Sequence, residues 1–163
     1  IDQYSDGEKS YNGPYNQFEF RSTLLNTTIR KAQLSRQARY YRWEEPRLAS
    51  EVDKSLQEAN VETSVFVSFF TPFKKNDNLP DGNSIWRVFI EAGGKRYDGK
   101  VKRDKRLFAE LETLFPYHER WGSAYLMKFP VSTSLLESTD ATMTITGPLG
   151  AKTVKFHAIK QSN

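Results

Sequence analysis

The apolar residues in the first third of the chain recur at helical spacing. Between Asn26 and Asn60 they fall mostly three, four or seven positions apart, in a stretch rich in Ala, Leu, Gln, Arg, Glu and Lys. Asn26 is a suitable N-cap residue. Pro46 interrupts the pattern, because proline lacks an amide hydrogen and crowds the preceding helical turn. The sequence therefore predicts helices at residues 26–43 and 46–60, with a kink near Pro46.

From residue 61 the period changes from helical to alternating. Residues 61–70 alternate and are rich in Val, Thr and Phe, which predicts a strand. Further on, Gly93-Gly94 predicts a hairpin over residues 84–102, because both central residues of a type I′ turn need a positive φ. The expected pairs are Ile90 with Tyr97, Val88 with Gly99 and Trp86 with Val101 on one face, and Glu91 with Arg96 and Arg87 with Lys100 on the other.

The rest of the chain predicts three more elements. Asp104 is a predicted N-cap for a short helix at residues 105–114. A strand is expected at residues 121–129, and a second hairpin at residues 141–158 with residues 148–151 as its loop. The expected pairs of this hairpin are Ile145 with Val154 and Met143 with Phe156.

Together these elements predict an α+β fold that is mainly β. Strands joined by turns or short connections favour antiparallel sheets, so we expect an immunoglobulin-like two-sheet β-sandwich preceded by an N-terminal helical segment. Residues 1–17 are rich in Ser, Asn, Gly, Asp and Tyr, which predicts a flexible lead. Residues 18–60 form the predicted helical segment, in which residues 18–21 are either a short strand or an apolar anchor. Residues 61–163 form the predicted sandwich domain.

The composition excludes several kinds of site. The chain has no cysteine, so it has no disulfide, no thiol nucleophile and no zinc site with thiolate ligands. It has no apolar run of about 18 residues, so no membrane span is expected. It also carries no phosphate-binding loop and no nucleophile-elbow motif. We therefore expect a non-catalytic protein without a metal or a cofactor.

One catalytic alternative remains, a hydrolase that uses His118. This histidine lies in a loop with Glu119 and Arg120, which together would offer a base, an acid and an anion-binding group. Sequence spacing pairs no nucleophile with His118. The other histidine, His157, lies in a polar stretch of the last predicted hairpin, and two isolated histidines do not form a recognisable metal motif.

Basic residues are concentrated in two stretches. The net charge is only +4, but residues 95–106 contain seven basic and two acidic residues, and residues 30–42 contain five basic residues and no acidic one. A nucleic acid, an anionic membrane surface or an acidic protein would be attracted to either stretch. The alternative is that both are ordinary solvated faces. The candidate binding residues in the first stretch are Lys100, Lys102, Arg103 and Arg106.

Aromatic residues lie beside arginines at the end of the first predicted helix. Tyr40, Tyr41 and Trp43 cannot all point inward, because nearby helical positions face different directions. Tyr, Trp and Arg are enriched among the residues that dominate the binding energy of protein interfaces. The second group of candidate binding residues is therefore Arg39, Tyr40, Tyr41, Arg42 and Trp43.

These features predict a protein-binding role in the cell envelope. The chain begins with Ile1 rather than methionine, as it would after removal of an export signal or downstream of a lipid-bearing segment. We expect an exported domain, periplasmic or membrane-anchored, whose partner is another envelope protein. Binding of nucleic acid or another polyanion is the main alternative. Carbohydrate binding has only the aromatic content in its favour.

Overall fold

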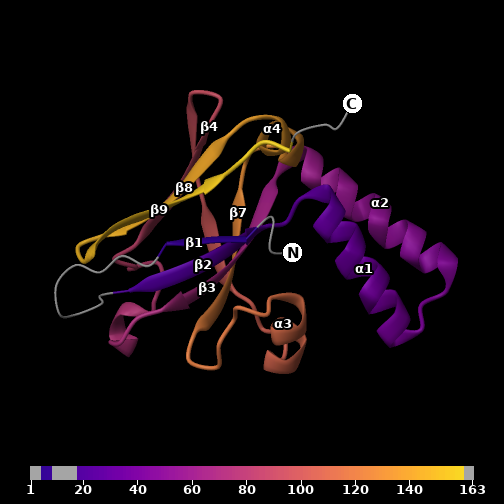
Figure 1. The fold of residues 1–163 in the computed structure, drawn as a ribbon, viewed down its shortest axis with the longest axis horizontal. Coiled ribbons are helices and arrows are strands. Elements are labelled where there is room, and N and C mark those ends of the chain that lie inside the picture. The colour runs from indigo at the N-terminus through magenta and orange to yellow at the C-terminus, as the bar shows by residue number, and fades with distance from the viewer. Residues whose placement is uncertain (1–4, 9–17, 160–163) are drawn as a thin grey trace.

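Two antiparallel sheets and four α-helices make up the described part of the chain. The computed structural model describes residues 5–8 and 18–159 (Figure 1). The first sheet contains, in order, β1 (Ser5–Glu8), β2 (Glu19–Leu24), β3 (Thr63–Phe70), β7 (Ser123–Phe129) and β6 (Lys100–Arg103); the second contains β5 (Lys95–Asp98), β4 (Arg87–Ala92), β8 (Ala141–Gly147) and β9 (Gly150–Phe156). The helices are α1 (Thr27–Tyr41), α2 (Glu45–Val61), α3 (Phe108–Leu114) and α4 (Thr133–Ser138), and the short 3₁₀ helix η2 covers Lys74–Asn76.

The α+β class and the two antiparallel sheets are confirmed. Helices and strands contain similar numbers of residues, so the description "mainly β" is wrong. The two sheets are consistent with a β-sandwich, but their strand order does not confirm immunoglobulin-like connections. None of the helices in residues 18–159 is long and apolar enough to span a lipid bilayer.

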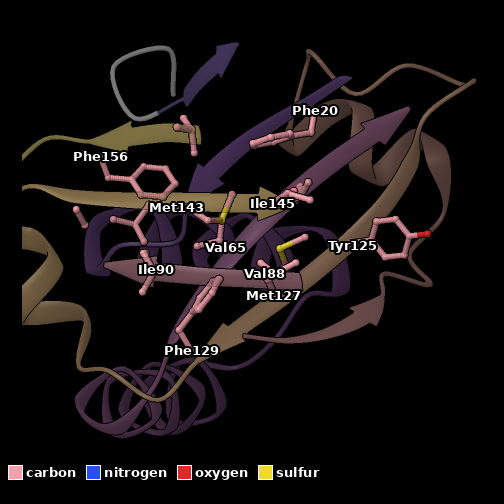
Figure 2. Close-up of a cluster of buried hydrophobic side chains, with 14 of the residues drawn as sticks. Phe20, Val65, Val88, Ile90, Tyr125, Met127, Phe129, Met143, Ile145 and Phe156 are labelled. Atoms are coloured by element: carbon pink, nitrogen blue, oxygen red, sulfur yellow. The ribbon is translucent and has the colours of Figure 1, made fainter. Parts of the chain in front are cut away.

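Side chains from both sheets form the main hydrophobic core (Figure 2). Alternate residues of β3 and β7 point into it, because successive side chains of a strand face opposite sides. The second sheet contributes the alternating residues of β4, β8 and β9. The largest fully buried side chains in this core include Phe20, Phe69, Ile90, Tyr125, Met127, Phe129, Met143 and Ile145.

The hairpin centred on Gly93-Gly94 follows its predicted register only as far as Gly99. Ile90 pairs with Tyr97 as expected, and the Gly99 amide donates to the Val88 carbonyl (2.8 Å). Beyond this point the chain passes to the other sheet as β6, so the predicted pairs of Trp86 with Val101 and Arg87 with Lys100 are wrong. Val101 pairs with Met127 of β7 instead. One continuous stretch of chain therefore joins the two sheets along one side.

The second hairpin keeps its predicted faces but changes its register. Its turn contains two residues rather than four, with Gly147 paired with Gly150. Gly150, the first residue after this turn, has a φ of 124°, which a residue with a side chain rarely adopts. The observed pairs are Met143 with Val154, Ile145 with Lys152 and Ala141 with Phe156, in place of the predicted ones.

The two predicted long helices are confirmed with slightly shifted ends. α1 begins after Asn26, whose side chain accepts a hydrogen bond from the Ile29 amide (2.9 Å). It ends at Tyr41, and its C-cap residue Arg42 has a left-handed φ of 51°. Pro46 lies in the first turn of α2, where no helical hydrogen bond requires its missing amide hydrogen. Figure 1 shows that α1 and α2 extend side by side away from the sheets.

The predicted division of the N-terminal part needs correction. β2 is a strand, so the helical segment begins at Thr27 and not at residue 18. Ser5–Glu8 is a strand that pairs with β2 and not part of a flexible lead; the other residues of that predicted lead lie outside the described residues. Because β1 and β2 share a sheet with β3, this sheet extends across the predicted boundary at residue 61.

Two short helices also differ from expectation. Asp104 does not cap α3, which starts at Phe108; its carboxylate accepts hydrogen bonds from the amide and guanidinium of Arg106 instead. The helix α4 was not predicted, because its six residues are too few to show a helical period.

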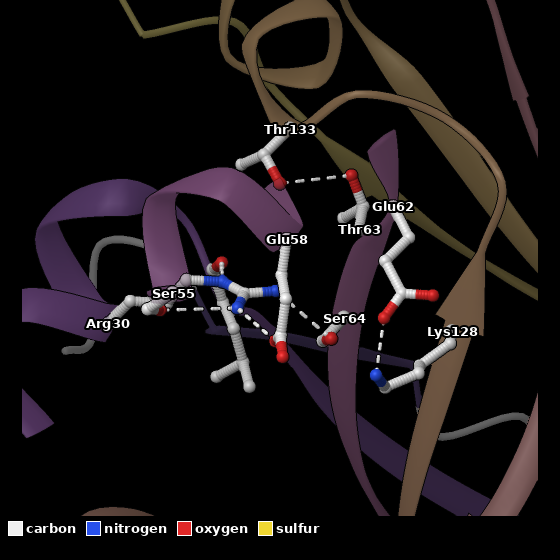
Figure 3. A network of polar contacts seen from close by, with 9 residues as sticks. Arg30, Ser55, Glu58, Glu62, Thr63, Ser64, Lys128 and Thr133 are labelled. Atoms are coloured by element: carbon white, nitrogen blue, oxygen red, sulfur yellow. Dashed lines mark hydrogen bonds and ion pairs between the residues drawn. The ribbon is translucent and has the colours of Figure 1, made fainter. Parts of the chain in front are cut away.

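Helices α1 and α2 form a helical hairpin, and a buried arginine fastens this hairpin to the first sheet (Figure 3). Arg30 of α1 is 8% exposed. Its guanidinium donates to the Leu25 carbonyl (3.0 Å), to Ser64 Oγ of β3 (3.0 Å) and to Ser55 Oγ of α2 (3.4 Å). Burial lowers the pKa of Arg30, and the charges of nearby glutamates, chiefly Glu58, oppose that shift. One side chain thus connects both helices with the sheet.

Candidate functional site

A mainly apolar groove lies between α1 and α3. Its volume is about 430 Å³. The side chains of Tyr40 and Leu107 on its two walls are 81% and 76% exposed. The Arg36 guanidinium of α1 donates to the Thr113 carbonyl of α3 (3.3 Å). We call this feature the helical groove; its lining residues are Gln33, Arg36, Gln37, Tyr40, Tyr41, Leu107, Ala109, Glu110, Thr113 and Leu114.

A second hydrophobic cluster holds the two walls of the helical groove in place. Phe66 lies on the outer face of β3, and its ring stacks on Phe115 with 3.7 Å between centroids. Ile29 of α1 and Leu114 of α3 pack in the same cluster. The N-terminal half of α1 is therefore packed on the sheet, while the part of α1 that bears Tyr40 borders the groove.

The three predicted aromatic side chains stay together, since Trp43 stacks on Tyr41 with 6.4 Å between ring centroids, but Trp43 does not line the helical groove. Tyr40 and Tyr41 line the helical groove, and their rings meet edge to face with centroids 5.0 Å apart. Trp43 is half-buried beneath the Arg47 guanidinium, which lies 4.6 Å from its ring centroid. Arg39 and Arg42 are exposed but are not groove residues. The binding role of all five predicted residues stays untested.

The predicted basic group lies apart from the helical groove. Lys100 and Lys102 are exposed on β6, which is the edge strand of the first sheet. Lysines on an edge strand hinder pairing with another chain, which is a structural reason for their presence. Arg106 is half-buried in its ion pair with Asp104 (2.5 Å). The next residue, Leu107, is the point at which this stretch reaches the groove.

Arg103 takes part in an internal polar cluster. Its guanidinium donates to the Asp77 carbonyl (2.9 Å) and lies 5.2 Å from the ring centroid of Tyr125. The Asp77 carboxylate accepts hydrogen bonds from the hydroxyls of Ser123 and Tyr125. Burial and this carboxylate raise the pKa of Tyr125. The cluster ties the loop after β3 to the first sheet, so Arg103 has a structural role.

A second hollow lies at the end of β2 and β3 where Glu19 pairs with Phe70, and its lining residue Ser68 is hydrogen-bonded to His118, which does not line the hollow. Its volume is about 500 Å³. Ser68 is on its floor, and the Ser68 hydroxyl is 2.8 Å from Nδ1 of the buried His118. Burial lowers the pKa of His118, and the charge of Asp104 opposes the shift. We call this hollow the β2–β3 pocket; its lining residues are Glu19, Phe20, Arg21, Ser68, Phe70, Tyr117, Glu119, Trp121 and Gly122.

The distance between Ser68 and His118 suits a nucleophile and its base. The backbone around Ser68 instead favours a structural role, in which His118 holds the Ser68 hydroxyl in place. An acyl-transfer site needs N–H groups directed at the developing oxyanion. β3 is paired on both sides, by β2 and β7, so the Ser68 amide belongs to the sheet. The Gly122 amide donates to the Glu119 carbonyl (2.9 Å). The hydrolase that was expected to use His118 with Glu119 stays an untested alternative.

Sequence reasoning missed Ser68 because fifty positions separate it from His118. It lies in an alternating strand, where a serine on the outer face is unremarkable. Only the packing of the loop at 117–122 over β3 brings the two side chains together.

We expect His118 to make the stability depend on pH. A histidine with a lowered pKa in the folded state takes up its proton more readily when unfolded. The unfolding free energy should therefore fall as the pH drops below about 6.5, the ordinary pKa of histidine, and level off below the folded-state pKa. The similarly lowered pKa of Asp104 acts only near or below the ordinary aspartate pKa of about 3.8, so the two pH ranges are separate.

Urea titrations between pH 7.5 and pH 5 measure this effect. In His118→Asn the amide can replace the Nδ1 hydrogen bond without titrating, so the decrease should disappear. His157→Asn removes the exposed histidine and should retain it. An unchanged pH dependence in His118→Asn would contradict the assignment.

Comparison with protein-family models, with curated proteins and with solved structures finds no match for this chain.

Proposed function

We propose that the chain is a non-catalytic protein-binding domain, in which an immunoglobulin-like two-sheet body supports the helical hairpin. The observation that carries this proposal is the helical groove. Tyr40, Tyr41 and Leu107 expose large apolar surfaces on its opposite walls. Exposed apolar groups gathered around a hollow are typical of a binding surface, whereas single exposed side chains are common anywhere.

The charge of the α1 wall favours an acidic helix as the occupant, with its carboxylates directed at α1 and away from Glu110 on the α3 wall. α1 contains four basic residues and no acidic residue. Three of them, Lys31, Arg36 and Arg39, are exposed. An amphipathic helix could place apolar side chains between α1 and α3 and its carboxylates against these cations. A basic helix would instead be repelled by the same wall.

The end of α1 supplies a further argument. Arg42 occupies a left-handed position that glycine usually takes at the end of a helix. An L-residue there costs roughly 1–2 kcal/mol. Strained residues of this kind cluster at functional sites, so the strain favours a role for the Arg42 side chain. Arg42 is exposed next to the groove residue Tyr41, which is the place for a contact with an acidic partner.

We also propose that the domain works outside the cytoplasm, with another envelope protein as its partner. The total absence of cysteine supports this location, since free thiols are readily oxidised there. Fractionation of the native host cells tests it directly. Recovery of the protein in the cytosolic fraction would contradict it.

A photo-crosslinking residue at position 40 tests the binding function. We expect it to capture one protein segment in native cells, and that segment to be an acidic amphipathic helix. The synthetic segment should bind the purified domain, and Tyr41→Ala should weaken binding at least about tenfold, as at an interface hot spot. Arg36→Glu should weaken it as well, because it reverses a charge on the groove wall.

The matched control is Val61, which is 70% exposed but lies outside the helical groove. The crosslinker at position 61 should not capture the segment, and Val61→Ser should bind it normally. Capture of nucleic acid or of a basic segment at position 40 would contradict the proposed occupant. Equal affinities of Tyr41→Ala and the unmodified domain would contradict the groove as the site.

A further inference from the structure

The β2–β3 pocket has a floor of four side chains arranged on the outer face of the first sheet. Glu19 pairs with Phe70, and Arg21 pairs with Ser68, across the two neighbouring strands. Side chains in directly paired positions lie about 5 Å apart, so the four form a compact square. The loop at 117–122 forms the wall above them.

Trp121 on this wall provides a broad aromatic surface. Its side chain is 81% exposed, although it lines the pocket. Phe70 on the floor is 41% exposed. An indole left open to solvent above a hollow that also holds charged side chains offers a flat apolar face to a ligand.

The charges of the lining discriminate between classes of ligand. Glu19 and Glu119 bring carboxylates that accept hydrogen bonds and repel anions. Arg21 brings a guanidinium that donates hydrogen bonds and repels cations. A neutral molecule whose hydroxyls both donate and accept can bond to both kinds of group. A sugar has such hydroxyls, together with an apolar face of C–H groups that can stack on an aromatic ring.

Ser68 on the floor is held by His118 from outside the pocket lining, and Gly122 lies beside it. His118 holds the Ser68 hydroxyl at 2.8 Å, which limits the directions in which this hydroxyl can form a further hydrogen bond. A side chain at Gly122 would bring its Cβ within 3.0 Å of Ser68 Oγ. Glycine at this position therefore keeps the hydroxyl accessible from the pocket.

We propose that the β2–β3 pocket binds a neutral carbohydrate. A sugar ring stacks on Trp121, and its hydroxyls bond to Glu19, Glu119, Arg21 and Ser68. This site is separate from the helical groove, so it does not depend on the proposed protein-binding function.

Tryptophan fluorescence with defined sugars tests the proposal. The probes are neutral hexasaccharides of β-1,4-linked glucose, β-1,4-linked N-acetylglucosamine and α-1,4-linked glucose, titrated to about 10 mM. The protein is the Trp43→Phe variant, which leaves Trp121 as the exposed indole because Trp86 is 5% exposed. We expect a saturable change in emission with at least one of these sugars, and an affinity that stays within about twofold when salt is raised from about 0.05 to 0.5 M.

Binding of the same sugar is then measured by calorimetry in variants of the full chain. Trp121→Ala should lose at least about tenfold in affinity, and Arg21→Ala and Gly122→Val should also bind more weakly. Phe73→Ala is the matched control, since this aromatic residue is 59% exposed and lines neither the β2–β3 pocket nor the helical groove. It should bind normally.

Three results would overturn the proposal: no response to any of the three sugars, unchanged affinity in Trp121→Ala, or binding that weakens steeply with salt. The last result would indicate a charged ligand.

Discussion

Replacing Gly99 by alanine is expected to lower the free energy of unfolding by about 1–3 kcal/mol, the range for overpacking a closed core. Gly99 lies where the chain leaves β5 in the second sheet and enters β6 in the first. A Cβ atom there would lie 2.6 Å from Cε1 and 3.1 Å from Cζ of Phe129. Phe129 is completely buried, so its ring has little room to move. The cost arises from this contact, because Gly99 does not have a left-handed φ.

Chemical denaturation of two further variants separates the contact from a general effect of replacing glycine. Gly82→Ala should change the stability by less than about 0.5 kcal/mol, since no atom lies within 4 Å of its added Cβ. Gly99→Ala should cost less in a Phe129→Leu background than in the unmodified chain, because the smaller side chain makes room for the methyl group. Equal stability of Gly99→Ala and the unmodified chain would show that the crossing tolerates a side chain.

Replacing Arg30 by methionine is expected to cost about 3 kcal/mol. The substitution leaves the Leu25 carbonyl and the Ser64 hydroxyl without their hydrogen-bond donor in a buried place, and each such group costs about 1–3 kcal/mol. The ion pair with Glu58 adds little to this figure, since the Glu58 side chain is 59% exposed and its distance to Arg30 is 3.8 Å.

The adjacent Lys31 offers a matched control, because it is exposed on the same helix. Lys31→Met should change the unfolding free energy by less than about 0.5 kcal/mol. Hydrogen exchange supplies a second readout: in Arg30→Met the amides of α1 and α2 should exchange faster, while those of β8 and β9 should change little. Equal losses in the two variants would mean that Arg30 does not fasten the hairpin.

The site was only partly predictable from sequence. The exposure of Tyr40 and Tyr41 followed from helix geometry, which is local. Their position opposite Leu107 did not, because it depends on how α1 and α3 pack over Phe66. The same holds for Ser68 and His118, since no pattern within a strand reveals which loop will cover it.

For this protein the sequence by itself determined the features that depend on neighbours along the chain. The cap at Asn26, the break before Pro46, the turn at Gly93-Gly94 and the inward faces of the strands all follow from backbone preferences and from periods of 3.6 and 2. Tertiary structure alone decided which strand lies beside which. Alternation fixes the side on which a residue lies but not its partner strand, so the passage of the chain between sheets at Gly99 required the packing of Phe129, and both pockets required the packing of distant segments.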